Sequence, residues 1–381
     1  MRGTPAGDSC PGFRVPQPVQ SKPLAPQPVQ PQPRVPQPVQ SKPLAPQPVQ
    51  PQPRVPQPVQ SKPLAPQPVQ LQPRILFQRG MKMNFEKAIS ERSSHLNEVI
   101  QAYLPKPEGY AARVIEAMDY SVEAGGKRLR PMFVLETCRM YGGEERDAAP
   151  FLAALEMIHT YSLVHDDLPE MDNDEYRRGK KTTHAVFGAG MAVIAGDGLL
   201  NFAYETVLRA IAEEEREAVQ ARKIRAACLM AKNAGVYGMV GGQCADLVGE
   251  GKNGVTAGEL WYIHKHKTAC MIESGLAIGA MLAGAPEDDI DRLQKIGEDI
   301  GIAFQIEDDI LDVRGSAAEL GKSTGKDAAE NKATYISVHG LEQAERDAEK
   351  LTREALGLFD SLSAENEFLR TLIQSLMTRT H

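Results

Sequence analysis

From Asn84 to the C-terminus, apolar residues recur every three or four positions, and the alternation typical of β-strands is absent. This period predicts helices over residues 84–104, 108–124, 128–141, 147–166, 186–211, 217–235, 257–283, 286–313 and 341–377. Most breaks fall at glycine-rich joints, such as Gly125-Gly126 and Gly142-Gly143. We predict one all-α domain, an orthogonal helical bundle rather than a coiled coil, because no heptad repeat persists.

The first 80 residues have a different composition. Of the 28 prolines, 22 precede Met81, and a 20-residue Pro/Gln-rich sequence starting at Val15 recurs at 35 and, with one substitution, at 55. Proline fixes φ and removes a hydrogen-bond donor, and too few large apolar residues are present to form a core. We therefore predict that residues 1–80 are disordered and that residues 81–381 form the helical domain. We expect the repeats to be an upstream extension, not native coding sequence; a spacer or a docking strip for PxxP-binding domains is the alternative.

Charge divides the chain in the same way. Residues 1–80 carry nine Lys and Arg against one acidic residue, a net charge of +8. Because the whole chain has a net charge of −7, residues 81–381 carry −15. An acidic helical body argues against nucleic acid as a partner. No stretch approaches the roughly 20 apolar residues of a membrane span, so no stable membrane insertion is expected. The five cysteines lack CxxC spacing, which predicts reduced, buried thiols in a cytoplasmic protein.

Two acidic clusters interrupt apolar helical sequence. The first comprises Asp166, Asp167 and Asp172, and the second comprises Asp308, Asp309 and Asp312. A solvated helix end could explain either cluster alone. Because Mg²⁺ prefers a few carboxylate oxygens together with substrate phosphates, two inward-facing clusters on separate helices favour a metal site inside a bundle.

Four cationic groups accompany the acidic clusters. They contain Lys127 and Arg130 in GGKRLRP, Arg177 and Arg178 in RRGK, Lys267 and Thr268 in HKHKT, and Lys322 and Lys332 after the second acidic cluster. Backbone amides at a helix start and arginine forks bind oxyanions well, although each group could also be an ordinary basic surface. We expect His264 and His266 to be surface residues rather than metal ligands. Together, the charges imply two anionic substrates bridged by metal, and the apolar helices imply a hydrophobic substrate body.

The motifs GGKRLRP, EMIHTYSLVHDDLPEMDNDEYRRGK, AGDGLL, GGQCAD, HKT, FQIEDDILD and GKSTGKD resemble those of the trans-isoprenyl diphosphate synthases, most closely the bacterial farnesyl diphosphate synthases. The resemblance covers residues 84–381 and leaves the proline-rich repeats unmatched. It implies the isoprenoid synthase type of helical bundle and a homodimer. It also implies head-to-tail condensation of isopentenyl diphosphate with dimethylallyl and geranyl diphosphate to give farnesyl diphosphate.

The resemblance further implies residue roles. The six aspartates would hold two or three Mg²⁺ ions, with Mn²⁺ as a possible substitute, on the allylic diphosphate. Arg177, Lys267, Lys322 and Lys332 would bind that diphosphate. Isopentenyl diphosphate would contact Lys127, Arg130, His159 and Arg178, while Thr268 and Gln305 would face the reacting carbons.

Product chain length depends on the depth of the hydrocarbon cavity. Tyr161, five residues before Asp166, is expected to form the floor of the hydrocarbon cavity, because Ser162 beside it is too small to block a growing chain. A geranylgeranyl diphosphate synthase is the nearest alternative, followed by a terpene cyclase, which the intact second aspartate cluster disfavours. A non-catalytic partner subunit would fit a degraded cluster, and none is degraded. One departure is Ile336, where many relatives carry proline, which affects the predicted C-terminal loop.

Overall fold

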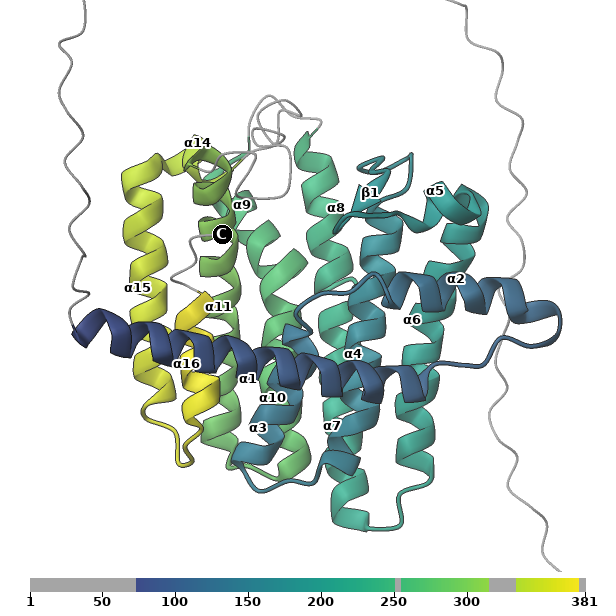
Figure 1. Cartoon of the computed structure of the whole chain (residues 1–381), viewed down its shortest axis with the longest axis horizontal. Helices are drawn as coiled ribbons and strands as arrows, with labels where there is room; N and C mark the ends of the chain where they lie inside the picture. Colours follow the sequence, from purple (N-terminus) through teal and green to yellow (C-terminus); the bar gives the residue numbers. More distant parts are fainter. Residues whose placement is uncertain (1–72, 251–254, 315–333, 377–381) are drawn as a thin grey trace, which may run out of the picture. The chain divides into compact units, whose positions relative to one another are not determined.

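The computed structural model describes residues 73–250, 255–314 and 334–376, with side chains from residue 84. These residues belong to the unit Val69–His381, which is almost entirely helical, as predicted (Figure 1). Its α-helices are α1 (Pro73–Tyr103), α2 (Ala112–Val122), α3 (Leu129–Met140), α4 (Glu145–Asp166), α5 (Thr183–Phe187), α6 (Ala189–Ala212), α7 (Glu217–Ala234), α8 (Met239–Glu250), α9 (Ala257–Ile263), α10 (Cys270–Ala283), α11 (Glu287–Arg314), α14 (Tyr335–His339), α15 (Leu341–Phe359) and α16 (Glu367–Leu376). A 3₁₀ turn (Gly109–Ala111), a π-helical segment (His264–Ala269) and a hairpin of β1 (Tyr176–Arg177) and β2 (Lys180–Lys181) complete the described elements.

Helix existence was predicted better than helix boundaries. The expected helix 186–211 is divided at Gly188, whose φ of 87° belongs to the left-handed region. The expected helix 257–283 contains the π-helical segment, and 341–377 is interrupted between Phe359 and Glu367. Helices α8 and α14 and the hairpin were not predicted. Helix α14 and the hairpin are too short for an apolar period to be measured, and α8 contains Gly241, Gly242 and Gly249, which weaken a helical pattern.

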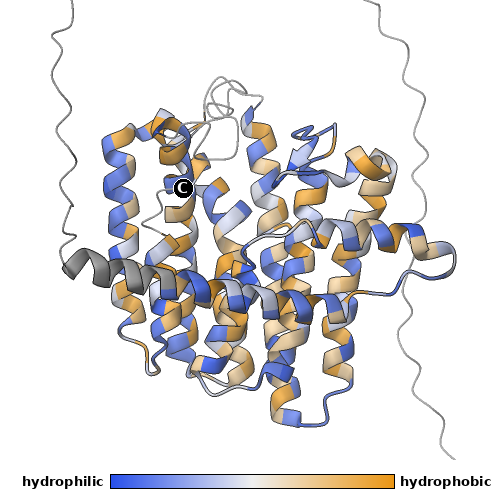
Figure 2. Cartoon of the chain, viewed as in Figure 1, coloured by the Kyte–Doolittle hydropathy of each residue, from blue (hydrophilic) through white to orange (hydrophobic). Residues whose placement is uncertain are grey.

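Helix α10 forms the centre of the bundle. Twelve of its fourteen residues are buried, from Cys270 to Leu282, because it packs against α3, α4, α7 and α11. A helix that is apolar on all sides is stable only when it is covered on all sides. By contrast, α15 buries one face, comprising Ala344, Ala348, Leu351, Ala355 and Phe359, and exposes the other. Figure 2 shows this alternation of hydrophobic and hydrophilic surface along the outer helices.

Small residues let the central helices approach one another closely. A side chain at Gly279 of α10 would overlap the backbone of α3, and one at Gly275 would make a tight contact with Phe133 and the Arg130 carbonyl of α3. At Gly242 of α8 and Gly301 of α11 a side chain would overlap the backbone of the π-helical segment. The helices that carry the acidic and basic motifs are therefore fixed by backbone contact as well as by side-chain packing.

Helix α1 runs crosswise to most of the other helices (Figure 1). It begins at Pro73, eight residues before the predicted domain boundary at Met81. Its Arg92 donates to Glu136 of α3 at 3.0 Å and lies over the ring of Phe368 of α16, 3.7 Å from the centroid. This helix therefore ties the first and last helices of the described bundle to α3.

We expect deletion of residues 1–72 to change neither the melting temperature nor the activity. Their sequence carries few apolar side chains that could repay the entropy of ordering. Thermal melts of the full chain and of the truncated chain, with parallel rate measurements, check this. A fall of several degrees would contradict it, and deletion of residues 1–100, which removes most of α1, is the destabilising comparison.

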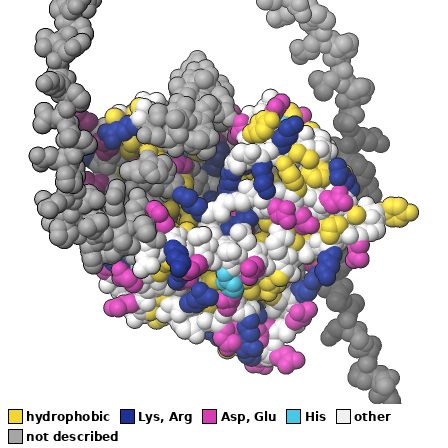
Figure 3. All heavy atoms as spheres, in the orientation of Figure 1, with side chains coloured by type: hydrophobic (Ala, Val, Ile, Leu, Met, Phe, Trp, Pro, Cys, Tyr) yellow, Lys and Arg dark blue, Asp and Glu magenta, His cyan; other side chains and the backbone are white. Residues whose placement is uncertain are grey.

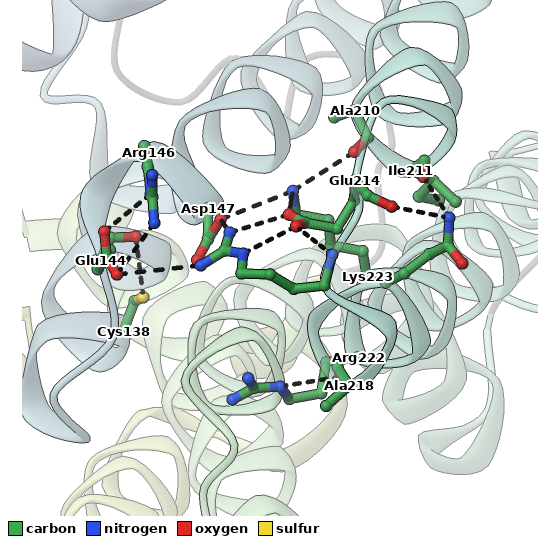
Figure 4. A network of polar contacts seen from close by, with 12 residues as sticks. Cys138, Glu144, Arg146, Asp147, Ala210, Ile211, Glu214, Ala218, Arg222 and Lys223 are labelled. Carbon is green, nitrogen blue, oxygen red and sulfur yellow. Dashed lines mark hydrogen bonds and ion pairs between the residues drawn. The ribbon is translucent and has the colours of Figure 1, made fainter.

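At one end of the bundle, a charged network joins the α6–α7 turn to the start of α4 (Figure 4). Buried Lys223 donates to Glu214 at 2.6 Å and lies 3.6 Å from Asp147. Lys223 also donates to the carbonyl of Ala210 at 3.4 Å, and Gln220 donates to the carbonyl of Ile211 at 2.9 Å. The network therefore satisfies carbonyls at the end of α6 and fixes that end relative to α4.

The surface bears on the predictions about membranes, charge and cysteines. Within the described ranges, no helix is long and apolar enough to cross a membrane. On the face drawn in Figure 3, acidic and basic side chains are interspersed over the described atoms, so that face has no broad single-sign surface. The prediction of buried thiols is correct for Cys138 and Cys270 but wrong for Cys228 and Cys244, which lie on the outward sides of α7 and α8.

Candidate active site

The first acidic cluster lies where α4 ends. The turn closes tightly, because the backbone N–H of Asp172 donates to the carbonyl of Asp166 at 2.9 Å. Burial raises the pKa of Asp166 to about 6; nearby Lys267 opposes this shift, and Asp172 adds to it. Neighbouring carboxylates are therefore held together in a partly desolvated position, where their charges repel.

Asp167 has a different partner. Its carboxylate is buried and accepts from Arg177 Nε, at 2.8 Å to Oδ1 and 3.0 Å to Oδ2. Burial raises the pKa of Asp167, and Arg177 opposes that shift. The hairpin thus folds back so that the basic motif contacts the acidic cluster that precedes it in the sequence.

A basic pocket lies beside this hairpin. Its lining includes His159, Arg177 and Arg178, and it has a volume of about 30 Å³. Arg178 has a φ of 53° and donates to the carbonyl of Gly125, which brings RRGK against the GGKRLRP turn. Burial lowers the pKa of His159 well below its usual range, and Arg130 and Arg178 lower it further. His159 is therefore neutral beside several guanidinium groups.

Arg130 and Lys127, the other two predicted cations, do not line this pocket. Arg130 is half-buried, and burial lowers its pKa. Among the described residues, its buried Nε has no hydrogen-bond partner. An unpaired buried guanidinium nitrogen is costly unless an anion binds to it, so this atom favours an anion site. Lys127 is exposed.

The π-helical segment links the two acidic clusters. Lys267 influences the pKa of Asp166, and its Nζ donates to Asp246 of α8 at 2.5 Å. The next residue, Thr268, donates through its hydroxyl to Gln305 Oε1 of α11 at 2.5 Å. Consecutive residues of one turn thus connect α4, α8 and α11.

The second acidic cluster lies near the end of α11. Asp308, Asp309 and Asp312 are half-buried, and Asp309 Oδ2 accepts from the backbone N–H of Tyr335 at 2.5 Å. Ile336 lies in the first turn of α14, whose start is stabilised by a capping box between Thr334 and Ser337. The predicted cations Lys322 and Lys332 lie outside the described residues.

The residues fit a divalent cation of the Mg²⁺ type. The raised pKa of Asp166 reflects burial and like-charge repulsion, both of which a cation would relieve. Across the described segments, no three acidic, histidine or cysteine side chains are arranged to hold a metal ion by themselves. Mg²⁺ commonly binds through one or two carboxylates together with substrate phosphates, so such a cage is not required.

The two chain-length candidates lie on α4. Tyr161 is 7% exposed, and its ring packs edge-on against His165 at 5.7 Å between centroids. Burial raises the pKa of Tyr161 to about 12, and Tyr204 of α6 and Asp166 raise it further. Ser162 is half-buried and donates to the carbonyl of His159 at 2.9 Å. Tyr161 therefore fills space between α4 and α6 just below the acidic cluster.

Sequence reasoning missed three residues. Asp246 pairs with Lys267, although GGQCAD was recognised only as a motif. Arg128 is buried and binds Glu156 at 2.6 Å and Asn97 at 2.7 Å, so this arginine of GGKRLRP stabilises the turn. His264, expected at the surface, is buried at 7% exposure because Tyr335 of α14 covers it. His266 is half-buried.

Known proteins resemble this chain over most of the helical unit. Residues 111–373 match the model of the polyprenyl synthetase family. A farnesyl diphosphate synthase of Geobacillus stearothermophilus is 44% identical over 260 residues, which are 68% of this chain and 86% of that protein. The large subunit 1 of a heterodimeric geranylgeranyl pyrophosphate synthase of Arabidopsis thaliana is 45% identical over 274 residues, covering 71% of this chain and 73% of that protein.

A solved structure has the same fold. The geranylgeranyl pyrophosphate synthetase of Pyrococcus horikoshii superposes with a TM-score of 0.71 at 30% identity, covering 78% of this chain and 99% of that one. Members of the matched family act on isopentenyl and allylic diphosphates and generally use divalent metal ions. The chain therefore belongs to the polyprenyl synthetase family and is a prenyltransferase that makes prenyl diphosphates.

Proposed function

We propose that the chain is a farnesyl diphosphate synthase, which condenses isopentenyl diphosphate head to tail with dimethylallyl and then geranyl diphosphate and stops at fifteen carbons. The observation that carries this proposal is buried Tyr161, one and a half turns of α4 below Asp166. A large ring at that depth can block a chain that starts at the acidic cluster. The named relatives include both farnesyl and geranylgeranyl synthases, so a C20 product is the alternative.

In this proposal the allylic diphosphate lies between Asp166, Asp167 and Asp172 on one side and Asp308, Asp309 and Asp312 on the other. Arg177 and Lys267, with Lys322 and Lys332, bind its oxygens. Mg²⁺, when bound, supplies positive charge that stabilises the leaving diphosphate. The partners of Arg177 and Lys267 support these roles, because Asp167 and Asp246 hold both cations beside the cluster.

Isopentenyl diphosphate would bind beside the basic pocket, contacting His159 and Arg178 of its lining and Lys127 and Arg130 of the GGKRLRP segment. His159 contributes as a neutral hydrogen-bond donor, because its lowered pKa prevents protonation near neutral pH. The unpaired Nε of Arg130 would then donate to a diphosphate oxygen. Such placement holds the double bond of isopentenyl diphosphate near the allylic carbon.

The reaction needs charge stabilisation and exclusion of water. The allylic carbon–oxygen bond breaks, diphosphate leaves with the electron pair, and the double bond of isopentenyl diphosphate attacks the allylic cation. The resulting cation loses a proton, which the released diphosphate accepts. Thr268 and Gln305, hydrogen-bonded to each other, present oxygen dipoles that stabilise the passing positive charge.

We further propose a homodimer in the cytoplasm. Apolar side chains are exposed between Val236 and Val248, including Tyr237 at 80%, and would be covered in a dimer. The four described cysteines are all unpaired, which fits a reducing compartment. Sedimentation equilibrium tests the dimer, and the variant Tyr237→Asp should dissociate it.

The product assay tests the central proposal. Purified protein is incubated with dimethylallyl and isopentenyl diphosphates and Mg²⁺, and the dephosphorylated products are separated by chromatography. Farnesol is expected as the main alcohol. A main product of twenty carbons would establish the alternative, and the absence of any prenyl product would refute the synthase proposal.

A further inference from the structure

Tyr335 connects the second acidic cluster to the rest of the bundle. It is the first residue of α14, is 5% exposed, and donates from its backbone N–H to Asp309 Oδ2. Its hydroxyl donates to Asp347 Oδ2 of α15 at 2.9 Å, and Asp347 also accepts from Gln343 at 2.9 Å. Both ends of this tyrosine are therefore fixed by carboxylates on different helices.

Two imidazoles lie near the ring of Tyr335. His339 stacks on it with centroids 4.4 Å apart, and His264 lies nearly parallel at 6.1 Å. The ring nitrogen Nδ1 of His264 is buried and has no hydrogen-bond partner among the described residues. The contact that His264 makes with Tyr335 is therefore a packing contact of the ring.

His264 begins the π-helical segment that carries Lys267 and Thr268. A displacement of the Tyr335 ring would consequently affect the support of this segment and the orientation of Asp309 together. Groups that orient a metal-binding carboxylate contribute to metal affinity although they never touch the metal.

We propose that Tyr335 is a positioning residue, packed near His264 and His339, whose backbone N–H orients the Asp309 carboxylate for divalent cation binding. The proposal rests on the proposed function, which assigns Asp309 to the metal. It predicts that metal and allylic substrate binding depend on Tyr335, while isopentenyl diphosphate binding beside the basic pocket does not.

Two substitutions distinguish the contribution of the Tyr335 backbone N–H from that of its ring. Tyr335→Ala removes the ring and keeps the N–H, whereas Tyr335→Pro removes both. Proline is favoured at the first position of a helix. The preceding Thr334, with φ −104° and ψ 160°, already has the extended conformation that a following proline requires. The matched control is Tyr141→Ala, since the Tyr141 hydroxyl also donates to a carboxylate, Asp289 at 3.0 Å, near the opposite end of α11.

The readout is Mn²⁺ binding, measured by electron paramagnetic resonance with a non-ionising dimethylallyl thiolodiphosphate, together with the KM of each substrate. We expect Tyr335→Pro to weaken Mn²⁺ binding by about 10- to 100-fold, Tyr335→Ala to weaken it less, and Tyr141→Ala to leave it unchanged. The KM for the allylic diphosphate should rise in both Tyr335 variants, with the KM for isopentenyl diphosphate unchanged.

Equal Mn²⁺ affinity in Tyr335→Pro and Tyr335→Ala would overturn the role of the N–H, and wild-type affinity in both would overturn the whole proposal. If circular dichroism shows that Tyr335→Pro does not fold, the comparison of Tyr335→Ala with Tyr141→Ala tests the contribution of the ring, and wild-type Mn²⁺ affinity in Tyr335→Ala would overturn the proposal. Mn²⁺ binding does not depend on turnover. A wild-type protein that binds Mn²⁺ but makes no prenyl product would therefore refute the proposed function and still test Tyr335.

Discussion

Replacing Asp166 by alanine is expected to lower kcat on the order of 100- to 1,000-fold, because neutralisation of the leaving diphosphate is the main source of rate acceleration in such a reaction. Asp308→Ala should have an effect of similar size. Steady-state rates at saturating Mg²⁺ and both substrates measure it. The control is Asp288→Ala, an exposed aspartate at the other end of α11, which should retain normal rates. Near-normal activity of Asp166→Ala would refute the assignment of the clusters.

The same substitution should stabilise the metal-free protein. Because the pKa of Asp166 is raised from 3.8 to about 6 in the folded state, its ionised form destabilises the fold. This cost begins as pH rises above 4 and is fully present above 6. In EDTA at pH 7.5, Asp166→Ala should therefore melt at a higher temperature than wild type, and the difference should disappear at pH 4. A lower melting temperature at pH 7.5 would mean that the carboxylate stabilises the bundle.

Tyr161→Ala should shift the main product from fifteen carbons to twenty or more. Removing the buried ring leaves a cavity below Asp166 into which the hydrocarbon can extend, and the cavity should cost about 3 kcal/mol of unfolding free energy. Tyr161→Phe, which keeps the ring, is the control and should still yield fifteen carbons. Chromatography of the dephosphorylated products measures the change. An unchanged product from Tyr161→Ala would place the floor elsewhere.

The sequence predicted helices well where the apolar period is long, as in α4 and α11, because burial of one face requires that period. It could not locate the π-helical segment within 257–283. A π-helical turn differs from an α-helical turn by one residue, and the local sequence carries no sign of this difference. In the folded chain, α8 and α11 pack closely against the segment. The sequence also could not predict burial of His264, because the covering residue, Tyr335, is far away in the sequence.

In the candidate site, too, the sequence could not predict which residues pair with one another. Arg128 of GGKRLRP has a left-handed φ of 51°, and its side chain pairs with Glu156 in the lining of the basic pocket. Composition gives no sign of this conformation, because non-glycine residues rarely adopt it. The pairing of Lys267 with Asp246 likewise requires α8, a short helix that the apolar period did not reveal. Motif chemistry thus gave the candidate residues, and tertiary packing decided their partners.

Gly242 and Gly301, which lie against the π-helical segment, should slow the hydrogen exchange of its amides. A π-helical turn has poorer hydrogen-bond geometry than an α-helix, and alone it would be expected to open easily. Here α8 packs on it at Gly242 and α11 at Gly301, so we expect the turn to open only when these helices separate. The amides of residues 264–270 should therefore exchange with deuterium as slowly as those of α10, through opening of the whole bundle rather than of one turn. The turn that carries Lys267 and Thr268 would then keep its geometry from one turnover to the next.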